Sequence, residues 1–414
     1  MAFFLRRAPC LRGWIEHGAE GLEGNRSGRG RFRLCNTMSS MNAATPAQDQ
    51  PQGCATVALE DDGADFSRYA LIIDARSPHE YLEDHVPGAV NLPVVDDNEF
   101  AQVGVAHVEN PHAAYVIGAA YASKNLARHI QSHISRCRPS DRILVYCFRG
   151  GKRSRVWGDT LRNIGFATDV MPGGWKAYRA WVRQGLGVLP LQSSYRVLSS
   201  LTGCGKTRLL QALQQHGAQV LDLEGLALHR GSLLGSLPGE PQPPQKLFDS
   251  LLIARLRSFD RGQPVWIESE SKKIGQLQLP IALYDAMRSS QMIELRAPIQ
   301  ARVRLLMEEY PHFAATPHAM VAKLAPLKPL VGSEEIARWA QMADDGQVEQ
   351  LFERVLLTHY DPSYLRSSRR ASHQNGKDAL LELQGLDAAS MGEAAQNLIS
   401  QHGRSDPCAP ASLV

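Results

Sequence analysis

The chain has 414 residues, of which 43% are hydrophobic, and a formal net charge of +3. This length allows two to three domains, and this composition excludes a globally disordered chain. The nearly balanced charge excludes a histone-like polycation, so any nucleic acid would have to be bound through local patches. The apolar stretch at residues 115–122 is far shorter than the roughly 20 residues of a membrane-spanning helix. The seven cysteines include no C-x-x-C pair, which argues against a disulfide framework or a zinc site and favours a reducing cytoplasm.

The two ends of the chain differ from its middle. Residues 1–62 show no sustained helical or strand period and are predicted to form a disordered extension, and residues 371–414 are predicted to form a helical or loose tail. Residues 1–38 hold seven Arg against three Glu, a net charge of +4, so the remaining residues carry a net charge of −1. The mild basicity of the chain is therefore no indication of an RNA partner.

Between the ends, apolar strand patterns alternate with loops and helical patterns, which predicts an α/β fold. We expect strands at residues 71–74, 143–147, 195–198 and 265–268, and helices at residues 177–183, 208–216, 299–309 and 334–342. Two domains are predicted, at residues 63–186 and 195–370, and the second has a helical C-terminal part. Residues 187–194 contain Pro and Ser and are predicted to link the two domains.

The cysteine loop, residues 147–154, is the first chemical signal. Cys147 ends an apolar strand, and Ser154 lies where the next helix begins. Backbone N–H groups in such a strand-to-helix loop form a cradle for an anion, and nearby cations favour a reactive thiolate. Cys147 is therefore the predicted nucleophile, and the predicted anion-binding residues are Arg149, Gly150, Gly151, Lys152, Arg153 and Ser154.

The phosphate loop, residues 200–207, is the second signal. It matches G-x-x-x-x-G-K-[ST] except that Ser200 replaces the first Gly. The predicted phosphate-binding residues are Gly203, Gly205, Lys206 and Thr207. Lys206 would reach phosphate oxygens, and Thr207 would bind a magnesium ion or a phosphate directly. Glu268, at the end of the strand 265–268, and Glu270 are candidate acidic site residues.

The upstream segments 73–81 and 85–93 resemble the rhodanese-domain signature, Asp-x-Arg followed by His-x-Pro-Gly-Ala-x-Asn-x-Pro. The resemblance covers about residues 66–186 and implies that the loop cysteine carries sulfur or a heavier chalcogen. Asp74, Arg76 and Glu80 are expected to form a turn and an ion-pair network. The loop also fits Cys-x5-Arg, with Arg153 in the last place, which is the pattern of cysteine-dependent phosphatases. The loop alone therefore does not separate chalcogen transfer from phosphate-ester hydrolysis.

Several further segments occur in the order found in one family. The segments 146–154, 173–178, 222–231, 267–275 and 359–362 together resemble tRNA 2-selenouridine synthases. The resemblance implies a rhodanese-like domain followed by a P-loop NTPase-like domain, and a selenotransferase that acts on the wobble uridine of tRNA. It implies alkylation of 2-thiouridine by geranyl diphosphate, then replacement of the S-geranyl group by selenium from selenophosphate. Cys147 would carry a selanylsulfide intermediate.

The resemblance also implies the partners. The anticodon loop of tRNA would be the macromolecular substrate, and an enzyme that supplies selenophosphate is an expected partner. No tightly bound cofactor, no metal-ligand set and no membrane association are expected, apart from magnesium at the phosphate loop. Arg149, Lys152, Arg153 and Arg155 form one candidate tRNA-binding cluster, and residues 364–370 form a second. A further set of polar residues could take part in acid–base chemistry, but we expect a structural role for them at least as much. These residues are Asp222, Glu224, His229, His359 and Asp361.

The geranyl chain would need an apolar channel, which the sequence does not locate. Leu305, Leu306 and Met307 are expected to be ordinary core residues. Three other functions remain open at this point: a Cys-x5-Arg phosphatase joined to a P-loop kinase or NTPase, a sulfurtransferase joined to such a domain, and a non-enzymatic regulator. The motifs beyond the two loops favour the selenotransferase over all three.

Overall fold

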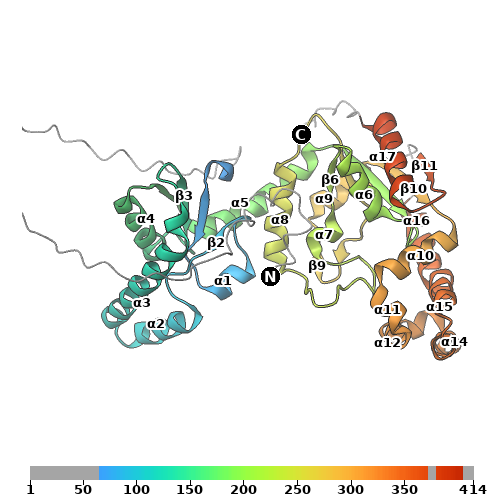
Figure 1. Cartoon of the computed structure of the whole chain (residues 1–414), viewed down its shortest axis with the longest axis horizontal. Helices are drawn as coiled ribbons and strands as arrows, with labels where there is room; N and C mark the ends of the chain where they lie inside the picture. The colour runs from blue at the N-terminus through green and yellow to red at the C-terminus, as the bar shows by residue number, and fades with distance from the viewer. Residues whose placement is uncertain (1–64, 372–378, 404–414) are drawn as a thin grey trace, which may run out of the picture. The chain divides into compact units, whose positions relative to one another are not determined.

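The computed structural model describes residues 65–371 and 379–403 (Figure 1). These residues belong to one compact unit, Cys54–Val414. The extension predicted at residues 1–62 lies outside the described residues. Within the compact unit the chain forms two parallel sheets, as the α/β prediction requires.

The first sheet has four parallel strands in the order β2-β1-β3-β4. The strands are β1 (Leu71–Asp74), β2 (Val90–Asn91), β3 (Arg142–Tyr146) and β4 (Ala167–Val170). The helices of this domain are α1 (Pro78–Glu83), α2 (Asp97–Glu109), α3 (Pro111–Ser132), α4 (Lys152–Ile164) and α5 (Gly174–Val188). Short 3-10 turns lie at Phe66–Arg68, Ile134–Arg136 and Leu189–Gln192.

Local sequence signals set the ends of several of these helices. Asp96 and Glu99 form a capping box at the start of α2. Asn110 accepts the first free N–H groups of α3, and Pro111 follows it at the first helical position, where its missing N–H costs nothing. Gly165 ends α4 with a left-handed φ of 113°, a conformation that favours glycine. The apolar run of β3 is fully buried, which places Cys147 at the edge of a rigid sheet.

The second sheet has five parallel strands in the order β11-β10-β5-β7-β6. They are β5 (Tyr195–Ser200), β6 (Gln219–Leu221), β7 (Val265–Glu268), β10 (Gln291–Arg296) and β11 (Ala379–Glu382), and a separate hairpin joins β8 (Lys273–Ile274) to β9 (Leu277–Gln278). The accompanying helices are α6 (Lys206–Gln215), α7 (Leu223–Ala227), α8 (Gln245–Arg257), α9 (Ile281–Ser289) and α17 (Ala388–His402). Because β7 lies directly beside β5, its terminal Glu268 comes close to the phosphate loop.

The predicted helical part is present between β10 and β11. It comprises α10 (Ile299–Glu309), α11 (Pro311–Ala315), α12 (Pro317–Leu324), a 3-10 turn (Ala325–Leu327), α13 (Lys328–Val331), α14 (Ser333–Asp344), α15 (Val348–Val355), a π-helical turn (Leu356–Tyr360) and α16 (Asp361–Ala371). The helix expected at residues 299–309 matches α10 at both ends. Leu305 and Leu306 are buried and Met307 packs against the core, as expected.

Two expectations about connecting segments need correction. The expected linker is largely helical, because α5 continues to Val188 and a 3-10 turn follows at once. The predicted helical or loose tail also contains an edge strand, β11, which pairs in parallel with β10. Helix α17 follows β11, and its apolar residues join the core that contains Leu209 and Leu213 of α6. Across the described part of the chain, no helix has the length and hydropathy of a membrane span.

Candidate functional site

The sulfur of the cysteine loop accepts a hydrogen bond from one backbone N–H and lies beside the Ser154 hydroxyl, which donates to the carbonyl oxygen of Gly151 at 3.1 Å. Cys147 follows β3 and is only 3% exposed. The N–H of Gly151 points at Cys147 Sγ from 3.2 Å, and Ser154 Oγ lies at the same distance from the sulfur. Gly151 is also the residue that precedes the first turn of α4. The sulfur therefore sits at the N-terminus of a 13-residue helix, where backbone N–H groups favour negative charge.

Glycine is required where the next element approaches this loop. Gly174 has a φ of +56°, and a Cβ added to it would lie 2.2 Å from the carbonyl oxygen of Cys147. Its neighbour Trp175 donates its backbone N–H to that same oxygen at 2.8 Å. Gly150 has a φ of +68°, and a Cβ there would lie 2.9 Å from the carbonyl oxygen of Met171. The backbone of the loop is thus fixed by close contact with the segment that leads into α5.

The cations predicted to surround Cys147 have different roles. Arg153 forms a salt bridge with Glu80, with 2.5 Å between Nη1 and Oε2, so this guanidinium is already paired. Lys152 is exposed, and its Nζ lies 3.2 Å from the centre of the Tyr115 ring. Arg149 and Arg155 are also exposed. The structure therefore leaves three of the four predicted cations on the surface around the loop.

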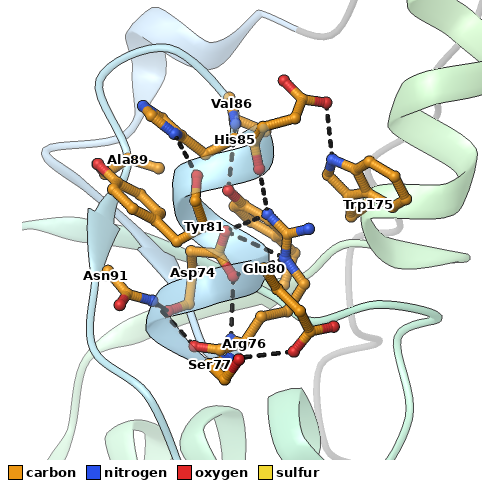
Figure 2. Close-up of polar contacts among 12 residues, drawn as sticks. Asp74, Arg76, Ser77, Glu80, Tyr81, His85, Val86, Ala89, Asn91 and Trp175 are labelled. Carbon is orange, nitrogen blue, oxygen red and sulfur yellow. Dashed lines mark hydrogen bonds and ion pairs between the residues drawn. The ribbon is translucent and has the colours of Figure 1, made fainter. Parts of the chain in front are cut away.

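The expected turn and ion pairs are present, but as two separate pairs: Asp74 pairs with Arg76, whereas Glu80 pairs with Arg153. In the turn, Glu80 accepts the N–H of Ser77 (Figure 2). Arg76 is 1% exposed and Asp74 is fully buried, and Arg76 Nη2 lies 2.6 Å from Asp74 Oδ2. The same Nη2 donates to the carbonyl oxygen of Asp84 at 2.6 Å. The guanidinium also lies against the ring of Trp175, 5.0 Å from its centre. Nε and Nη2 of Arg76 and both carboxylate oxygens of Asp74 are engaged in this pair, which is the arrangement of a structural ion pair.

The phosphate loop has the backbone form that its motif predicts. Gly203 and Gly205 both have left-handed φ angles, +82° and +80°, and α6 begins at Lys206. Lys206 Nζ lies 3.4 Å from Ser200 Oγ, so the side chain folds back over the loop. Thr207 Oγ1 donates to Glu224 Oε2 at 3.3 Å. The loop thus presents an ammonium group and the first N–H groups of α6, which together suit an anionic ligand.

Three carboxyls lie beside the phosphate loop, of which Glu268 is buried and Glu224 and Glu270 are half-buried. Burial and the nearby Glu270 raise the pKa of Glu224 to about 8, and burial also raises the pKa of Glu270. Glu268 Oε1 accepts the N–H of Glu224 at 2.8 Å, whereas Glu268 Oε2 has no hydrogen-bond partner. Burial raises the pKa of Glu268 well above its usual value. The structure therefore brings both predicted acidic residues to the loop and adds Glu224, for which the sequence left the role open.

The structure assigns a positioning role to part of the His359–Pro362 motif. Asp361 forms a two-pronged ion pair with Arg302, at 3.0 and 2.6 Å, and Arg302 Nε donates to the carbonyl oxygen of Thr202 at 2.9 Å. Asp361 thereby holds the phosphate loop through Arg302. Arg302 was not predicted, because an Arg within the helical pattern of residues 299–306 carries no local signal of its partners.

The remaining candidate residues have no contact that points to a catalytic role. Burial lowers the pKa of His229 and of His359. Asp222 caps α7 by accepting the N–H of Gly225 at 2.7 Å, which is a structural role. Tyr364 is partly buried in α16, whereas the side chains of residues 367–370, which carry most of the second basic cluster, lie outside the described residues. Among the residues that the structure describes, no group of three or more His, Cys, Asp or Glu side chains is arranged to hold a metal ion.

Comparison with known proteins connects the two domains to one family. A family model described as a rhodanese-like domain matches residues 58–180, and a model described as the tRNA 2-selenouridine synthase AAA domain matches residues 193–326. A tRNA 2-selenouridine synthase of Nitrosomonas europaea is 31% identical over 307 residues, which cover 72% of this chain and 77% of that protein. One from Cupriavidus pinatubonensis is 31% identical over 343 residues, covering 74% of this chain and 92% of that protein.

Proposed function

The chain belongs to the tRNA 2-selenouridine synthase family, and from this premise we propose that it converts a wobble 2-thiouridine of tRNA to 2-selenouridine in two steps. We assign the first step, transfer of a geranyl group, to the phosphate loop. We assign the second step, exchange of sulfur for selenium, to the cysteine loop. The observation that supports this assignment is the presence of two separate loops in one chain, each built to receive an anion.

In the first step, the 2-thiouridine sulfur attacks C1 of geranyl diphosphate. An S–C bond forms, the C1–O bond breaks, and diphosphate leaves with the bonding electrons while uridine N3 loses its proton. Lys206 and the N-terminal N–H groups of α6 would hold the diphosphate and stabilise the charge that develops on it. Arg302 and Asp361 would keep the loop in position for this step.

In the second step, selenium replaces the alkylated sulfur at C2 of the uracil ring. Alkylation makes sulfur a better leaving group, because it departs as geranylthiol. The selenium of selenophosphate forms the new bond to C2, the C2–S bond breaks, and water then takes the phosphoryl group as inorganic phosphate. This exchange needs no oxidant. The cysteine loop would hold the selenophosphate anion beside Cys147, where its selenium can react. This route forms no selanylsulfide on Cys147, unlike the route that the resemblance implies, because joining a thiol to selenide-level selenium would need an oxidant.

The exposed cations beside the cysteine loop support a contact with tRNA. Arg149, Lys152 and Arg155 lie on the surface, and Tyr115 lies under the Lys152 ammonium group. Cations that follow a phosphate backbone beside an aromatic ring are typical of surfaces that bind single-stranded RNA. We propose that this patch, residues 149–155 with Tyr115, holds the anticodon loop near Cys147.

The proposal is tested by giving the purified full-length protein a tRNA that carries 2-thiouridine and analysing the nucleosides by mass spectrometry. Geranyl diphosphate alone should give S-geranyl-2-thiouridine, and the further addition of selenophosphate should give 2-selenouridine and free geranylthiol. Selenouridine formed at the same rate without geranyl diphosphate would remove the first step from the proposal. Release of phosphate from aryl phosphates without any change in the tRNA would favour the Cys-x5-Arg phosphatase instead.

A further inference from the structure

One face of helix α2 carries exposed residues at helical spacing. Phe100, Gly104 and His107 lie four and three positions apart, so they follow one another along the same face of the helix. All three are exposed, and Phe100 is 47% exposed although it is a large aromatic residue. An added Cβ at Gly104 would meet no atom within 4 Å, so Gly104 leaves this face open between the two rings.

Tyr115, near the start of α3, extends this row of rings. Its ring is 49% exposed and lies 5.6 Å from the His107 ring, centre to centre. Helices α2 and α3 pack against each other along the chain (Figure 1). We call Phe100, Gly104, His107 and Tyr115 the aromatic strip. From Phe100 to His107 the helix rises about 10 Å, which is the length of about three nucleotides of one strand.

The aromatic strip lies beside the cysteine loop. Lys152 Nζ lies 3.2 Å from the centre of the Tyr115 ring. Arg153 Cζ lies 5.4 Å from the centre of the Phe100 ring. Lys152 and Arg153 directly follow Gly151, whose N–H donates to the sulfur of the cysteine loop. The strip is therefore joined to the proposed reaction site through the first turn of α4.

The chemistry of the aromatic strip indicates a partner that offers both flat rings and negative charge. Aromatic side chains stack on the faces of unpaired bases, and the cations beside them attract phosphates. Double-stranded RNA keeps its base faces inside the helix, so it would engage only the cations. A second copy of this chain, docked face to face, would bring the exposed Arg149 and Lys152 of both copies together, which disfavours that contact. A single-stranded RNA loop meets both requirements.

Neither neighbouring cation prevents a base from reaching the rings. Lys152 is exposed and has a flexible side chain, and a cation–π contact at an exposed site is weak. Its ammonium group can therefore move from the Tyr115 ring to a phosphate at little cost. Arg153 is held by its salt bridge with Glu80, which keeps a positive charge beside the Phe100 ring.

We propose that the aromatic strip stacks the unpaired bases that flank the wobble uridine, and so presents that uridine to the cysteine loop. The inference rests on the proposed function, which takes tRNA as the substrate. It adds helix α2 to the contact surface and assigns base contacts to α2 and α3, while the cations of the cysteine loop hold phosphates. The strip thereby selects an unpaired anticodon loop over helical RNA of equal charge.

The test compares two RNA stem-loops that differ only in their bases. One is an anticodon stem-loop with 2-thiouridine at the wobble position, and the other has abasic nucleotides on both sides of that uridine. Their phosphate charges are equal, so a difference in affinity for the full-length protein measures contact with the flanking bases. The unmodified protein should bind the intact loop at least about tenfold more tightly. Phe100→Leu should remove most of this difference, and Phe100→Tyr should keep it.

Gly104 provides a second test, in which every aromatic ring is kept. Gly104→Glu should fill the gap between Phe100 and His107 and place a negative charge beside the RNA, so binding of the intact loop should weaken by at least about tenfold. The change should not prevent folding, because Glu is a better helix former than Gly. The matched control is Gly187→Glu on α5, where an added Cβ also meets no atom within 4 Å. This control should keep the affinity within about twofold.

The outcomes separate the aromatic strip from the function on which it rests. Equal affinity of the unmodified protein for the intact and the abasic loop would overturn the strip and leave the contact between the cations and tRNA in place. An equal loss of affinity in Gly104→Glu and Gly187→Glu would also overturn it, because charge alone would then explain the effect. If Gly104→Glu dissociates a dimer in sedimentation without changing RNA affinity, the strip binds a second copy instead. If the unmodified protein binds neither RNA, the proposed tRNA contact fails, and the strip fails with it.

Discussion

The two loops of this molecule treat buried charge in opposite ways. Beside the cysteine loop, the buried carboxylate of Asp74 is matched by the buried guanidinium of Arg76 at 2.6 Å. Beside the phosphate loop, the buried Glu268 lies with the half-buried Glu224 and Glu270, and Glu268 Oε2 has no partner. Two buried charges that pair with each other fix the local structure. A buried polar group without a partner lowers the stability of the protein and is commonly retained because it binds a ligand. The difference indicates that the first region is stabilised before any substrate arrives and that the second is completed by what it binds.

The largest expected effect tests the matched pair. Arg76→Ala leaves the Asp74 carboxylate buried without a counter-ion, so the free energy of unfolding should fall by about 3–5 kcal/mol. The control is Arg138→Ala, which breaks an exposed ion pair with Asp141 and should cost less than about 1 kcal/mol. Urea unfolding followed by tryptophan fluorescence measures both changes. An equal loss in the free energy of unfolding for the two variants would mean that the buried pair stabilises the domain no more than an exposed pair does.

The next effect tests the phosphate loop, where activity and stability should respond differently. Lys206→Ala removes the ammonium group that would hold the leaving diphosphate, and geranylation of thiolated tRNA should fall by about 10²–10³-fold. Its stability should change by no more than about 1 kcal/mol, because Lys206 makes one long hydrogen bond, to Ser200, and otherwise interacts with Glu224 and Glu270 only through its charge. The control is the exposed Lys328→Ala. Unchanged geranylation in Lys206→Ala would remove the diphosphate from this loop.

A smaller effect tests the backbone of the cysteine loop. Gly174→Ala imposes a left-handed backbone strain of about 1–2 kcal/mol and places a Cβ against the Cys147 carbonyl oxygen, so the loop must shift. We expect a lower melting temperature and slower selenation, with geranylation retained. Gly187→Ala is the matched control on the same helix, because an added Cβ there meets no atom within 4 Å. Wild-type selenation by Gly174→Ala would show that the close approach of α5 is not needed for the chemistry.

The last prediction concerns how the carboxyls beside the phosphate loop respond to pH. The pKa of Glu224 is raised to about 8, so its contribution to stability is present below the pKa of the unfolded chain, near 4.5, and is lost as pH rises to 8. Glu224→Gln should therefore flatten the fall in stability between about pH 5 and 8 and be the more stable protein at pH 9. The exposed Glu349→Gln should keep the wild-type profile. Parallel profiles for Glu224→Gln and the wild type would contradict the account of this cluster.

The sequence predicted the parts of both sites that depend on short segments. Fewer than ten consecutive residues define each of three features: the cysteine loop, the phosphate loop, and β7 with Glu268. The glycines that the two loops require can be identified directly in the sequence. The pairing of Arg302 with Asp361 was not predictable, because the two residues are 59 positions apart and neither has an unusual neighbour. The parallel pairing of β11 with β10 was missed for the same reason, since it joins residues 379–382 to residues 293–296. The 22-residue helix α3 also went unpredicted, because its many Ala residues carry little amphipathic contrast.

The central claim is that the two loops perform two separable steps, and Cys147→Ser tests it most directly. The variant is incubated with thiolated tRNA, geranyl diphosphate and selenophosphate, and the nucleosides are analysed by mass spectrometry, with Cys137→Ser as the control for loss of a free thiol in the same domain. The account predicts that S-geranyl-2-thiouridine accumulates in Cys147→Ser while 2-selenouridine is absent, and that Cys137→Ser behaves as the wild type. A normal yield of 2-selenouridine from Cys147→Ser, or loss of both products, would contradict it.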